Sequence, residues 1–179
     1  MSNISDTELQ SRLSQLKLLA LDVDGILTDG GLYYTETGEV CKKFNVKDGK
    51  GIKLLMQSGI EVAIISANDS AATMYRAQKL GIVNCFTGVG EKLVVLKNLC
   101  QKLDLSLSEV AYMGDDLNDL PVLKAVGLPL TVADAIPENR AVAAYVTELT
   151  GGQGAVREVC NLLLNSQLKA DNNRERLSI

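Results

Sequence analysis

The sequence predicts an α/β fold in which helices cover both faces of a doubly wound, parallel sheet. Short, nearly continuous apolar runs alternate with longer amphipathic segments between residues 48 and 165. Apolar runs of this kind are typical of parallel strands that are buried on both faces. Several amphipathic segments stop at a glycine, which is favoured just after a helix end. The 179 residues, 46% of them apolar, suffice for one domain with a substantial core.

The N-terminal segment is expected to form a short helix that leads into the first strand. Ser5 and Glu8 have the spacing of a capping box, and leucines follow at helical spacing. The apolar run at residues 18–23 predicts the first strand. Residues 30–46 then indicate a β-hairpin, with short strands at 32–34 and 40–44 around a Thr-Glu-Thr-Gly turn. This hairpin occupies the place where a doubly wound fold normally has its first helix.

Helices and strands alternate through the rest of the chain. The predicted helices span residues 50–58, 70–80, 91–103, 119–126, 137–144 and 155–165. The predicted strands span residues 61–65, 82–86, 110–113, 128–130 and 145–146. Residues 166–179 are polar and predict a mobile tail, so we expect a single domain at residues 1–165.

The composition excludes several kinds of chemistry. The chain has no histidine, which excludes Ser-His-Asp hydrolysis, phosphohistidine transfer and histidine-based zinc sites. The net charge of −4 argues against nonspecific binding to nucleic acid or to an anionic membrane surface. Chemistry in this chain must therefore use carboxylates, lysine, hydroxyls, cysteine or a bound metal.

The cysteines and the N-terminus predict a soluble, cytoplasmic protein. The first 17 residues are polar and lack the apolar stretch of a signal peptide. The longest apolar run, residues 141–146, is too short to cross a bilayer. No close cysteine pair marks a zinc or redox site, and apolar neighbours predict buried free thiols that suit a reducing compartment. These cysteines are Cys41, Cys85, Cys100 and Cys160.

Polar side chains gather after several predicted strands. Open α/β sheets bind ligands at the carboxyl ends of their strands, so these side chains are expected to meet. They are Asp22 and Asp24 after the first strand, Ser66 after the strand at 61–65, Lys92 at the start of the helix after 82–86, and Asp115, Asp116, Asn118 and Asp119 after 110–113.

Several carboxylates at one sheet edge repel one another unless a positive charge lies among them. Two charges 4 Å apart interact by about 4 kcal/mol at an effective dielectric constant of 20. One lysine cannot balance so many carboxylates. Mg²⁺ prefers oxygen ligands and takes one or two carboxylates together with waters and phosphate oxygens. The cluster therefore predicts a site for Mg²⁺ and phosphate.

The spacing of Asp22 and Asp24 suits phosphoryl transfer in two steps. Residues two apart on a strand share a face, so Asp24 can lie beside the group that Asp22 attacks. The carboxylate of Asp22 can attack phosphorus to form an aspartyl-phosphate. Asp24 can protonate the leaving alcohol and later deprotonate the attacking water. Ser66 would then hold phosphoryl oxygens, and Lys92 would neutralise the developing charge.

Four motifs stand in a characteristic order along the chain. They are DVDGILTDG at residues 22–30, Ser66, Lys92 and GDDLND at residues 114–119. Together they resemble the haloacid dehalogenase-like phosphohydrolases, which implies a Rossmann-like sheet. The hairpin, FNVKDG at 44–49 and GGQGAVRE at 151–158 resemble more narrowly the 3-deoxy-D-manno-octulosonate 8-phosphate (KDO 8-phosphate) phosphatase family. This resemblance covers roughly residues 15 to 165.

The resemblance implies a role for each motif residue. It makes Asp22 the nucleophile and Asp24 the general acid/base, while Ser66 and Lys92 complete the phosphate site. It implies Mg²⁺ held by Asp22, the backbone carbonyl of Asp24 and Asp115, with support through water from Asp116 or Asp119. Arg157 is a candidate contact to the substrate carboxylate. The residues implied on the substrate side are Asn68, Lys47, Gly151, Gly152, Gly154 and Arg157.

These residues also have purely structural interpretations. A turn with solvated carboxylates, a solvated helix residue, a helix N-cap and a flexible glycine loop are each common at such positions. The positions with such an alternative are Asp22 and Asp24 as a turn, Lys92 as a solvated residue, Ser66, Asp48 and Asp119 as helix caps, and Gly151, Gly152 and Gly154 as a loop.

One position departs from the family pattern. Members that act on KDO 8-phosphate usually have Ser-Gly-Arg in the second motif, whereas this chain has Ser66, Ala67 and Asn68. Asparagine lacks the charged, bidentate grip of arginine on a carboxylate. KDO 8-phosphate is the expected substrate, and the 9-phosphate of a nine-carbon, sialic-type sugar acid is the alternative.

Two other functional classes stay open. A receiver-type domain also has an acidic cluster and a lysine, but its acid pair normally comes earlier in the chain than the acceptor aspartate, which lies on a later strand. In this chain the acid/base partner, Asp24, comes two residues after the nucleophile, Asp22, which disfavours this class. A non-catalytic assembly domain is disfavoured because Asp24 is intact.

The short segment at residues 30–46 leaves no room for a cap domain. Phosphatases exclude water by closing a lid or a domain, so a neighbouring subunit is expected to cover the site. Leu32, Tyr34 and Val40 alternate with polar residues, and an isolated hairpin is marginal in water. As the resemblance also implies, we expect a homotetramer with the hairpin at the interface and residues 151–157 reaching a neighbour's active site.

Overall fold

The chain folds around a six-stranded, parallel sheet in the order β5-β4-β1-β6-β7-β8. The computed structural model describes the backbone of residues 2–177 and the side chains of residues 2–168. The predicted doubly wound α/β fold is confirmed. The strands are β1 (Leu18–Leu21), β4 (Glu61–Ile65), β5 (Asn84–Phe86), β6 (Val110–Met113), β7 (Leu128–Thr131) and β8 (Tyr145–Val146).

The strand order reverses beside β1. From β1 the chain moves outward through β4 to β5, and then returns to β6 on the other side of β1. Leu21 is level with Ile64 of β4 and with Met113 of β6. The residues that follow these three strands therefore meet at one sheet edge. In open α/β sheets, the crevice at such a reversal is where ligands bind.

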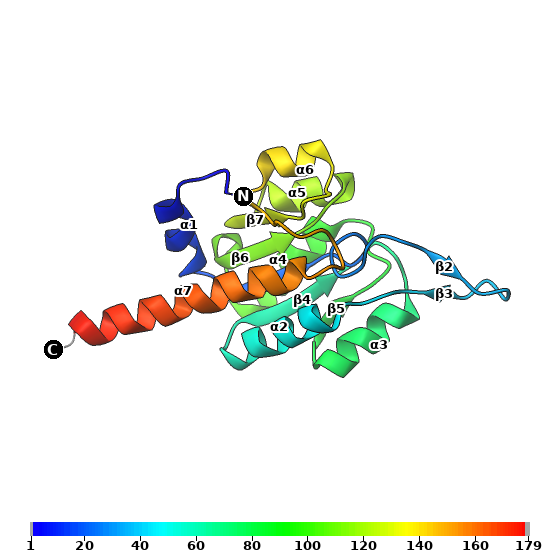
Figure 1. Cartoon of the computed structure of the whole chain (residues 1–179), viewed down its shortest axis with the longest axis horizontal. Coiled ribbons are helices and arrows are strands. Elements are labelled where there is room, and N and C mark those ends of the chain that lie inside the picture. Colours follow the sequence, from blue (N-terminus) through cyan, green and yellow to red (C-terminus); the bar gives the residue numbers. More distant parts are fainter. Residues whose placement is uncertain (1, 178–179) are drawn as a thin grey trace.

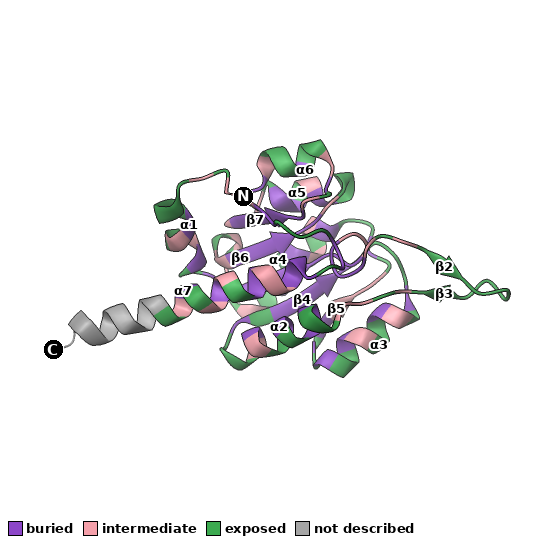
Figure 2. Ribbon diagram, viewed as in Figure 1, coloured by how far each residue is buried: buried purple, intermediate pink, exposed green. Residues whose placement is uncertain are grey.

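Helices cover both faces of the sheet (Figure 1), and a separate hydrophobic core forms on each face. Successive residues of β1 point to opposite faces, so Leu19 and Leu21 join one core while Leu18 and Ala20 join the other. Figure 2 shows β4, β6 and β7 of this sheet as mostly buried. One face carries α1 (Asp6–Leu13), α2 (Val46–Gln57), α3 (Ala71–Leu80) and α7 (Ala155–Leu177), and the other carries α4 (Lys92–Leu103), α5 (Leu120–Leu123) and α6 (Pro137–Val142).

Helix α2 begins four residues earlier than predicted. The side chain of Asn45 accepts a hydrogen bond from the backbone N–H of Lys47 at 2.8 Å and so caps the helix. The first turn therefore starts at Val46. Asp48 lies inside that turn, so its interpretation as the N-cap is wrong.

Helix α3 has its own capping serine. The side chain of Ser70 accepts a hydrogen bond from the N–H of Thr73 at 3.4 Å, and Gly81, with a φ of 84°, ends the helix. Ser66 directly follows β4 and is not the N-cap of this helix.

The segment after β6 does not form the helix predicted at residues 119–126. It contains a 3₁₀ turn, η2 (Leu117–Asp119), and only one turn of α-helix in α5. Asp116 caps η2 by accepting a hydrogen bond from the N–H of Leu117 at 2.7 Å. Asp119 makes no capping hydrogen bond to α5, so its interpretation as a cap of that helix is wrong.

The predicted hairpin is present and projects from the body of the protein (Figure 1). It consists of β2 (Tyr33–Tyr34) and β3 (Val40–Cys41), which are shorter than the strands predicted at 32–34 and 40–44. Both strands are exposed along their whole length (Figure 2). The side chains of the two strands are thus only partly covered by the described part of the chain.

The cysteines only partly match the prediction. All four are free thiols, and Cys100 and Cys160 are buried. Cys85 is half-buried and Cys41 is exposed, so the predicted burial of these two is wrong. For Cys41 the reason is its position in β3, because neither face of this short strand packs against the core.

The last helix, α7, runs to Leu177 and does not end at residue 165 as predicted. The segment beyond 165 has no glycine or proline and is rich in good helix formers, so nothing interrupts the backbone hydrogen bonds. The division into a domain at 1–165 and a mobile tail at 166–179 stays a prediction, and residues 178–179 lie outside the described residues. Within the described part of the chain, no helix combines the length and apolar character needed to cross a membrane.

Candidate active site

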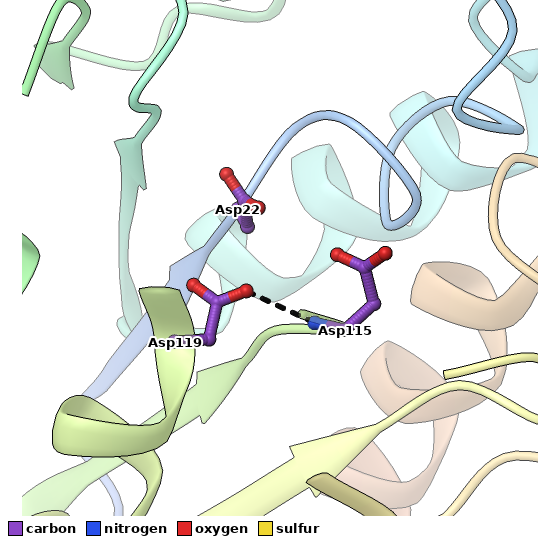
Figure 3. Close-up of side chains that lie close together, drawn as sticks. All are labelled: Asp22, Asp115 and Asp119. Atoms are coloured by element: carbon purple, nitrogen blue, oxygen red, sulfur yellow. Dashed lines mark hydrogen bonds between the residues drawn. The ribbon is translucent and has the colours of Figure 1, made fainter. Parts of the chain in front are cut away.

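Asp22 and Asp115 lie at the ends of adjacent parallel strands. Asp22 directly follows β1, and its backbone N–H donates to the carbonyl of Met113 at 3.0 Å. Asp115 comes two residues after β6. Figure 3 shows the side chains of these two residues close to that of Asp119, and one carboxylate oxygen of each of the three lies within 4.8 Å of the others.

Lys92 supplies a positive charge in this cluster. It is the first residue of α4, and its side chain is only 1% exposed. Its Nζ lies 2.9 Å from Oδ2 of Asp22 and 2.8 Å from Oδ1 of Asp119. The structure thus brings Lys92 to Asp22, and the solvated-helix interpretation of this lysine is wrong.

Asp119 is fully buried, and its acceptor positions are all used. Oδ1 accepts hydrogen bonds from Lys92 and from the hydroxyl of Tyr112, at 2.8 and 2.5 Å. Oδ2 accepts from the backbone N–H groups of Asp115 and Asp116, at 3.0 and 3.3 Å. A carboxylate offers about four acceptor positions, so Asp119 has none left for a metal ion. We therefore assign it the task of orienting Lys92 and the loop after β6.

Asp115 is in the opposite situation. Its Oδ1 is buried and has no hydrogen-bond partner among the described residues. Burial, followed by the negative charges of Asp22 and Asp119, raises the pKa of Asp115 to about 7. An unpaired carboxylate oxygen that faces another carboxylate fits a divalent cation that prefers oxygen ligands. Asp22 and Asp115 are thus the side chains best suited to hold Mg²⁺.

The electrostatics of Asp22 follow from the same crowding. Burial is the largest cause that raises its pKa, to about 7, and the charge of Asp119 adds to it. The ammonium of Lys92 acts in the opposite direction. A second positive charge at this point would favour the ionised carboxylate that a nucleophile needs.

Glycines allow the loops around the cluster to approach closely. Gly25 has a φ of 81°, and a Cβ there would overlap with Oδ2 of Asp115. Behind it, a Cβ on Gly151 would overlap with the carbonyl oxygen of Gly25, and the N–H of Gly152 donates to Ile26 at 3.0 Å. The GGQG loop therefore packs on the chain's own DVDGILTDG loop. That the segment also reaches a neighbour's active site stays a prediction.

Arg157 lies away from the cluster. Its backbone N–H donates to Oδ1 of Asp48 at 2.8 Å, and its Nε donates to Asn161 at 2.8 Å. Its side chain lies over Gly51 of α2, where a Cβ would be 2.8 Å from the arginine Cδ. Burial raises the pKa of the Asp48 carboxyl, whereas the N–H of Arg157 opposes this. Within one chain, these contacts give Arg157 a role in joining α2 to α7.

Two other predicted substrate-side residues have no described contact with the cluster. Lys47 is exposed in the first turn of α2, and its backbone N–H serves the cap of that helix. Gly154 has a φ of 108° just before α7, with Leu149 beside it.

Ser66 and Asn68 lie on the other side of Asp22, after β4. Ser66 is buried, and its backbone N–H donates to the carbonyl of Phe86 at 2.9 Å. The Nδ2 of Asn68 donates to Oδ2 of Asp24 at 3.4 Å. Asn68 is therefore brought to Asp24, while Ser66 is fixed by its backbone at the end of the sheet.

The site also contains residues that the sequence analysis missed. The Nζ of Lys42 lies 2.6 and 2.7 Å from the two oxygens of Asp24, and its side chain is 1% exposed. Tyr112, buried in β6, donates to Asp119. Neither residue carries a local signal, because both reach the cluster only through the tertiary fold.

A cleft of about 450 Å³ opens beside Asn68, whose Nδ2 donates to Asp24. The hairpin forms one wall, and the loop before α3 together with the start of that helix forms the other. Its lining residues are Glu39, Val40, Cys41, Asn68, Asp69, Ser70, Ala71 and Ala72.

Known proteins resemble this chain in both sequence and structure. A family model for haloacid dehalogenase-like hydrolases matches residues 88–159. The 3-deoxy-D-manno-octulosonate 8-phosphate phosphatase of Salmonella typhi is 47% identical over 165 residues, which cover 92% of this chain and 88% of that protein. The corresponding phosphatase of Escherichia coli strain K12 is 47% identical over 161 residues, covering 90% and 86%.

Two solved structures of such phosphatases superpose on this one. The structure from Yersinia pestis gives a TM-score of 0.90 at 44% identity, covering 94% of this chain and 90% of that one. The structure from Moraxella catarrhalis, in complex with a magnesium ion, a phosphate ion and KDO, gives a TM-score of 0.90 at 42% identity and covers 97% and 99%. The identity over nearly the whole length and the common fold together establish the relationship. This chain therefore belongs to the 3-deoxy-D-manno-octulosonate 8-phosphate phosphatase family of haloacid dehalogenase-like hydrolases.

Proposed function

We propose that this protein is a Mg²⁺-dependent phosphatase that hydrolyses KDO 8-phosphate to KDO and inorganic phosphate. The observation that carries the proposal is the pair of Asp22 and Asp115. The Nζ of Lys92 lies 2.9 Å from Oδ2 of Asp22, and Oδ1 of Asp115 is buried without a described hydrogen-bond partner. This arrangement provides a nucleophile, a positive charge and a cation site at one sheet edge.

In the first step, Asp22 attacks the phosphorus atom. One of its carboxylate oxygens forms a bond to phosphorus while the bond from phosphorus to the sugar oxygen breaks. Asp24 gives a proton to the departing sugar oxygen, so that an alcohol leaves and not an alkoxide. Lys92 stabilises the charge on the phosphoryl oxygens, and Ser66 contributes further hydrogen bonds.

In the second step, water attacks the aspartyl-phosphate on Asp22. Asp24, now a carboxylate, takes the proton from this water. The bond between phosphorus and the Asp22 oxygen breaks, which releases phosphate and restores the carboxylate of Asp22 and the protonated carboxyl group of Asp24. Asp119 takes no part in bond making, since its role is to hold Lys92 in place.

Asp22, Asp115 and the backbone carbonyl of Asp24 are the proposed ligands of Mg²⁺. When bound, the ion neutralises negative charge on the phosphoryl oxygens and on the clustered carboxylates. The magnesium and phosphate ions in the Moraxella catarrhalis structure support this choice of metal.

The cleft beside Asp24 is the proposed place of the sugar. Its lining residue Asn68 donates to Asp24, which protonates the leaving oxygen, and its volume of about 450 Å³ lies in the usual range for small-molecule sites. Asn68 lines it in place of the usual arginine. Because asparagine cannot form a charged pair with a carboxylate, the 9-phosphate of a nine-carbon sugar acid is the second candidate substrate.

We further propose that the protein is a homotetramer that works in the cytoplasm. The hairpin exposes Leu32, Tyr33, Tyr34 and Val40, and such an apolar surface on an isolated hairpin supports burial against other copies. The four free cysteines support a reducing compartment.

Phosphate release from a panel of sugar phosphates tests the proposed function. The panel contains KDO 8-phosphate, a nine-carbon 2-keto sugar acid 9-phosphate and glucose 6-phosphate, each with Mg²⁺ and with a chelator. The proposal predicts Mg²⁺-dependent hydrolysis with the highest kcat/KM for KDO 8-phosphate. Preference for the nine-carbon ester would establish the second candidate, and no turnover of any ester would refute the phosphatase assignment.

A further inference from the structure

Lys42 holds Asp24 from the side of the hairpin. It directly follows β3, and its Nζ lies 2.6 Å from Oδ1 and 2.7 Å from Oδ2 of Asp24. The ammonium thus bridges both carboxylate oxygens. The lysine side chain is 1% exposed, whereas that of Asp24 is 33% exposed. The lysine is therefore built into the protein, while the carboxylate that it holds faces the open side of the site.

The carboxylate of Asp24 depends on this contact for its orientation. It lies in the loop after β1, before Gly25 with its φ of 81°. Among the described residues, the other hydrogen bond to this carboxylate comes from Asn68, at a long 3.4 Å. Without Lys42, rotation about the side-chain bonds of Asp24 would be limited only by this weak contact.

The neighbouring lysine shows what is particular to Lys42. Lys43 pairs with Asp29 at 2.9 Å, and both side chains are partly exposed, at 55% and 25%. Exposed ion pairs of this kind contribute little, because solvent competes for both charges. Lys42, by contrast, would be left with a desolvated charge if Asp24 turned away. The pair of Lys42 and Asp24 is therefore expected to persist.

We propose that Lys42 is a positioning residue that holds the carboxylate of Asp24 at the edge of the cleft where the alcohol leaves. This inference rests on the proposed role of Asp24 as general acid/base. Each oxygen of Asp24 accepts one hydrogen bond from Lys42, and Oδ1 keeps a further acceptor position for the proton that it exchanges. Through Lys42, which itself does not touch the substrate, the hairpin takes part in proton transfer.

The choice of leaving group separates positioning from a merely structural role. A sugar alkoxide is a poor leaving group and needs a proton, whereas p-nitrophenolate leaves as a stable anion. The value of kcat/KM reports only the steps up to the first irreversible one, here the transfer of phosphate to Asp22. Misplacement of Asp24 should therefore reduce kcat/KM for a sugar phosphate much more than for p-nitrophenyl phosphate.

The experiment compares the full-length wild type with Lys42→Met, Asp24→Asn and the double variant, with Lys43→Met as the matched control. The sugar phosphate is the one that the wild type hydrolyses fastest. We expect Lys42→Met to lower its kcat/KM at least about tenfold more than that of p-nitrophenyl phosphate, within the usual contribution of general acid catalysis. In the Asp24→Asn background, the Lys42 substitution should cause no further loss. Lys43→Met should leave both substrates within about twofold of the wild type, as expected for an exposed pair.

The outcomes distinguish this inference from its alternatives. Equal losses with both substrates would mean a structural role and overturn the proposal. A further loss for the sugar phosphate in the double variant would mean that Lys42 contacts the sugar, which also overturns it. If Lys42→Met does not yield folded protein, Lys42→Gln, which keeps a neutral donor, is measured against the same expectations. Failure of the wild type to hydrolyse either ester would overturn the proposed function together with this inference.

Discussion

Gly25 and Asp115 are packed so closely that a Cβ on the glycine would overlap with Oδ2 of the carboxylate. The first belongs to the loop after β1 and the second to the loop after β6. This contact fixes the position of a proposed metal ligand against the backbone of the nucleophile's loop. Only glycine at position 25 leaves room for the side chain of Asp115 in this position.

Gly25→Ala is predicted to weaken Mg²⁺ activation. The added methyl group must push Asp115 aside, and it also strains a φ of 81°. The concentration of Mg²⁺ for half-maximal activity should rise about tenfold or more, in line with the loss expected when a metal ligand or its support is disturbed. Gly38→Ala is the matched control, because Gly38 has a φ of 82° but no atom within 4 Å of the Cβ position. An unchanged Mg²⁺ requirement in Gly25→Ala would contradict the assignment of Asp115 as a ligand.

Mg²⁺ is predicted to stabilise the folded protein even without substrate. An ion that binds only the folded state raises the free energy of unfolding by RT ln(1 + [L]/Kd). Thermal unfolding of the wild type should therefore occur at a higher temperature with Mg²⁺ than with a chelator. The shift should disappear in Asp115→Asn, which loses the unpaired charged oxygen, and persist in Asp134→Asn, whose carboxylate accepts from Gly151. Persistence of the full shift in Asp115→Asn would place the metal elsewhere.

Asn68→Arg is predicted to raise kcat/KM for KDO 8-phosphate. The guanidinium would stand at the cleft beside Asp24 and offer a bidentate partner to the substrate carboxylate. The value for glucose 6-phosphate, which has no carboxylate, should not rise. If the wild type already prefers KDO 8-phosphate strongly and the substitution is harmful, then this interpretation of position 68 is wrong.

The oligomeric state is predicted to depend on the hairpin. Light scattering on the wild type at micromolar concentration should give the mass of a tetramer. Tyr34→Glu places a charge on the exposed face of β2 and should lower that mass, because a charge buried without a partner opposes association. Val83→Glu is the control, since Val83 is 90% exposed and lies outside the hairpin. An active monomeric wild type would refute the proposed tetramer.

The sequence predicted the parts of this structure that depend on local pattern. The apolar runs located every strand of the main sheet, and the rule that ligands bind at strand ends brought Asp22, Lys92 and Asp115 together. The end of α7 was missed because the polar segment beyond residue 165 has no apolar periodicity, although its residues favour a helix. The contact of Asp119 with Lys92 was missed because the lysine lies 27 residues earlier, at the start of α4. Such a long-range contact leaves no trace in residue spacing.

The proposed mechanism requires a covalent phosphate at Asp22. Rapid acid quenching of the wild type with Mg²⁺ and its best sugar phosphate, followed by borohydride reduction, converts an aspartyl-phosphate into homoserine, which peptide mass spectrometry locates. We predict homoserine at position 22, absent without substrate and absent in the inactive Asp22→Asn variant. Undiminished turnover by Asp22→Asn, or homoserine at Asp24 or Asp115 in place of Asp22, would contradict the account.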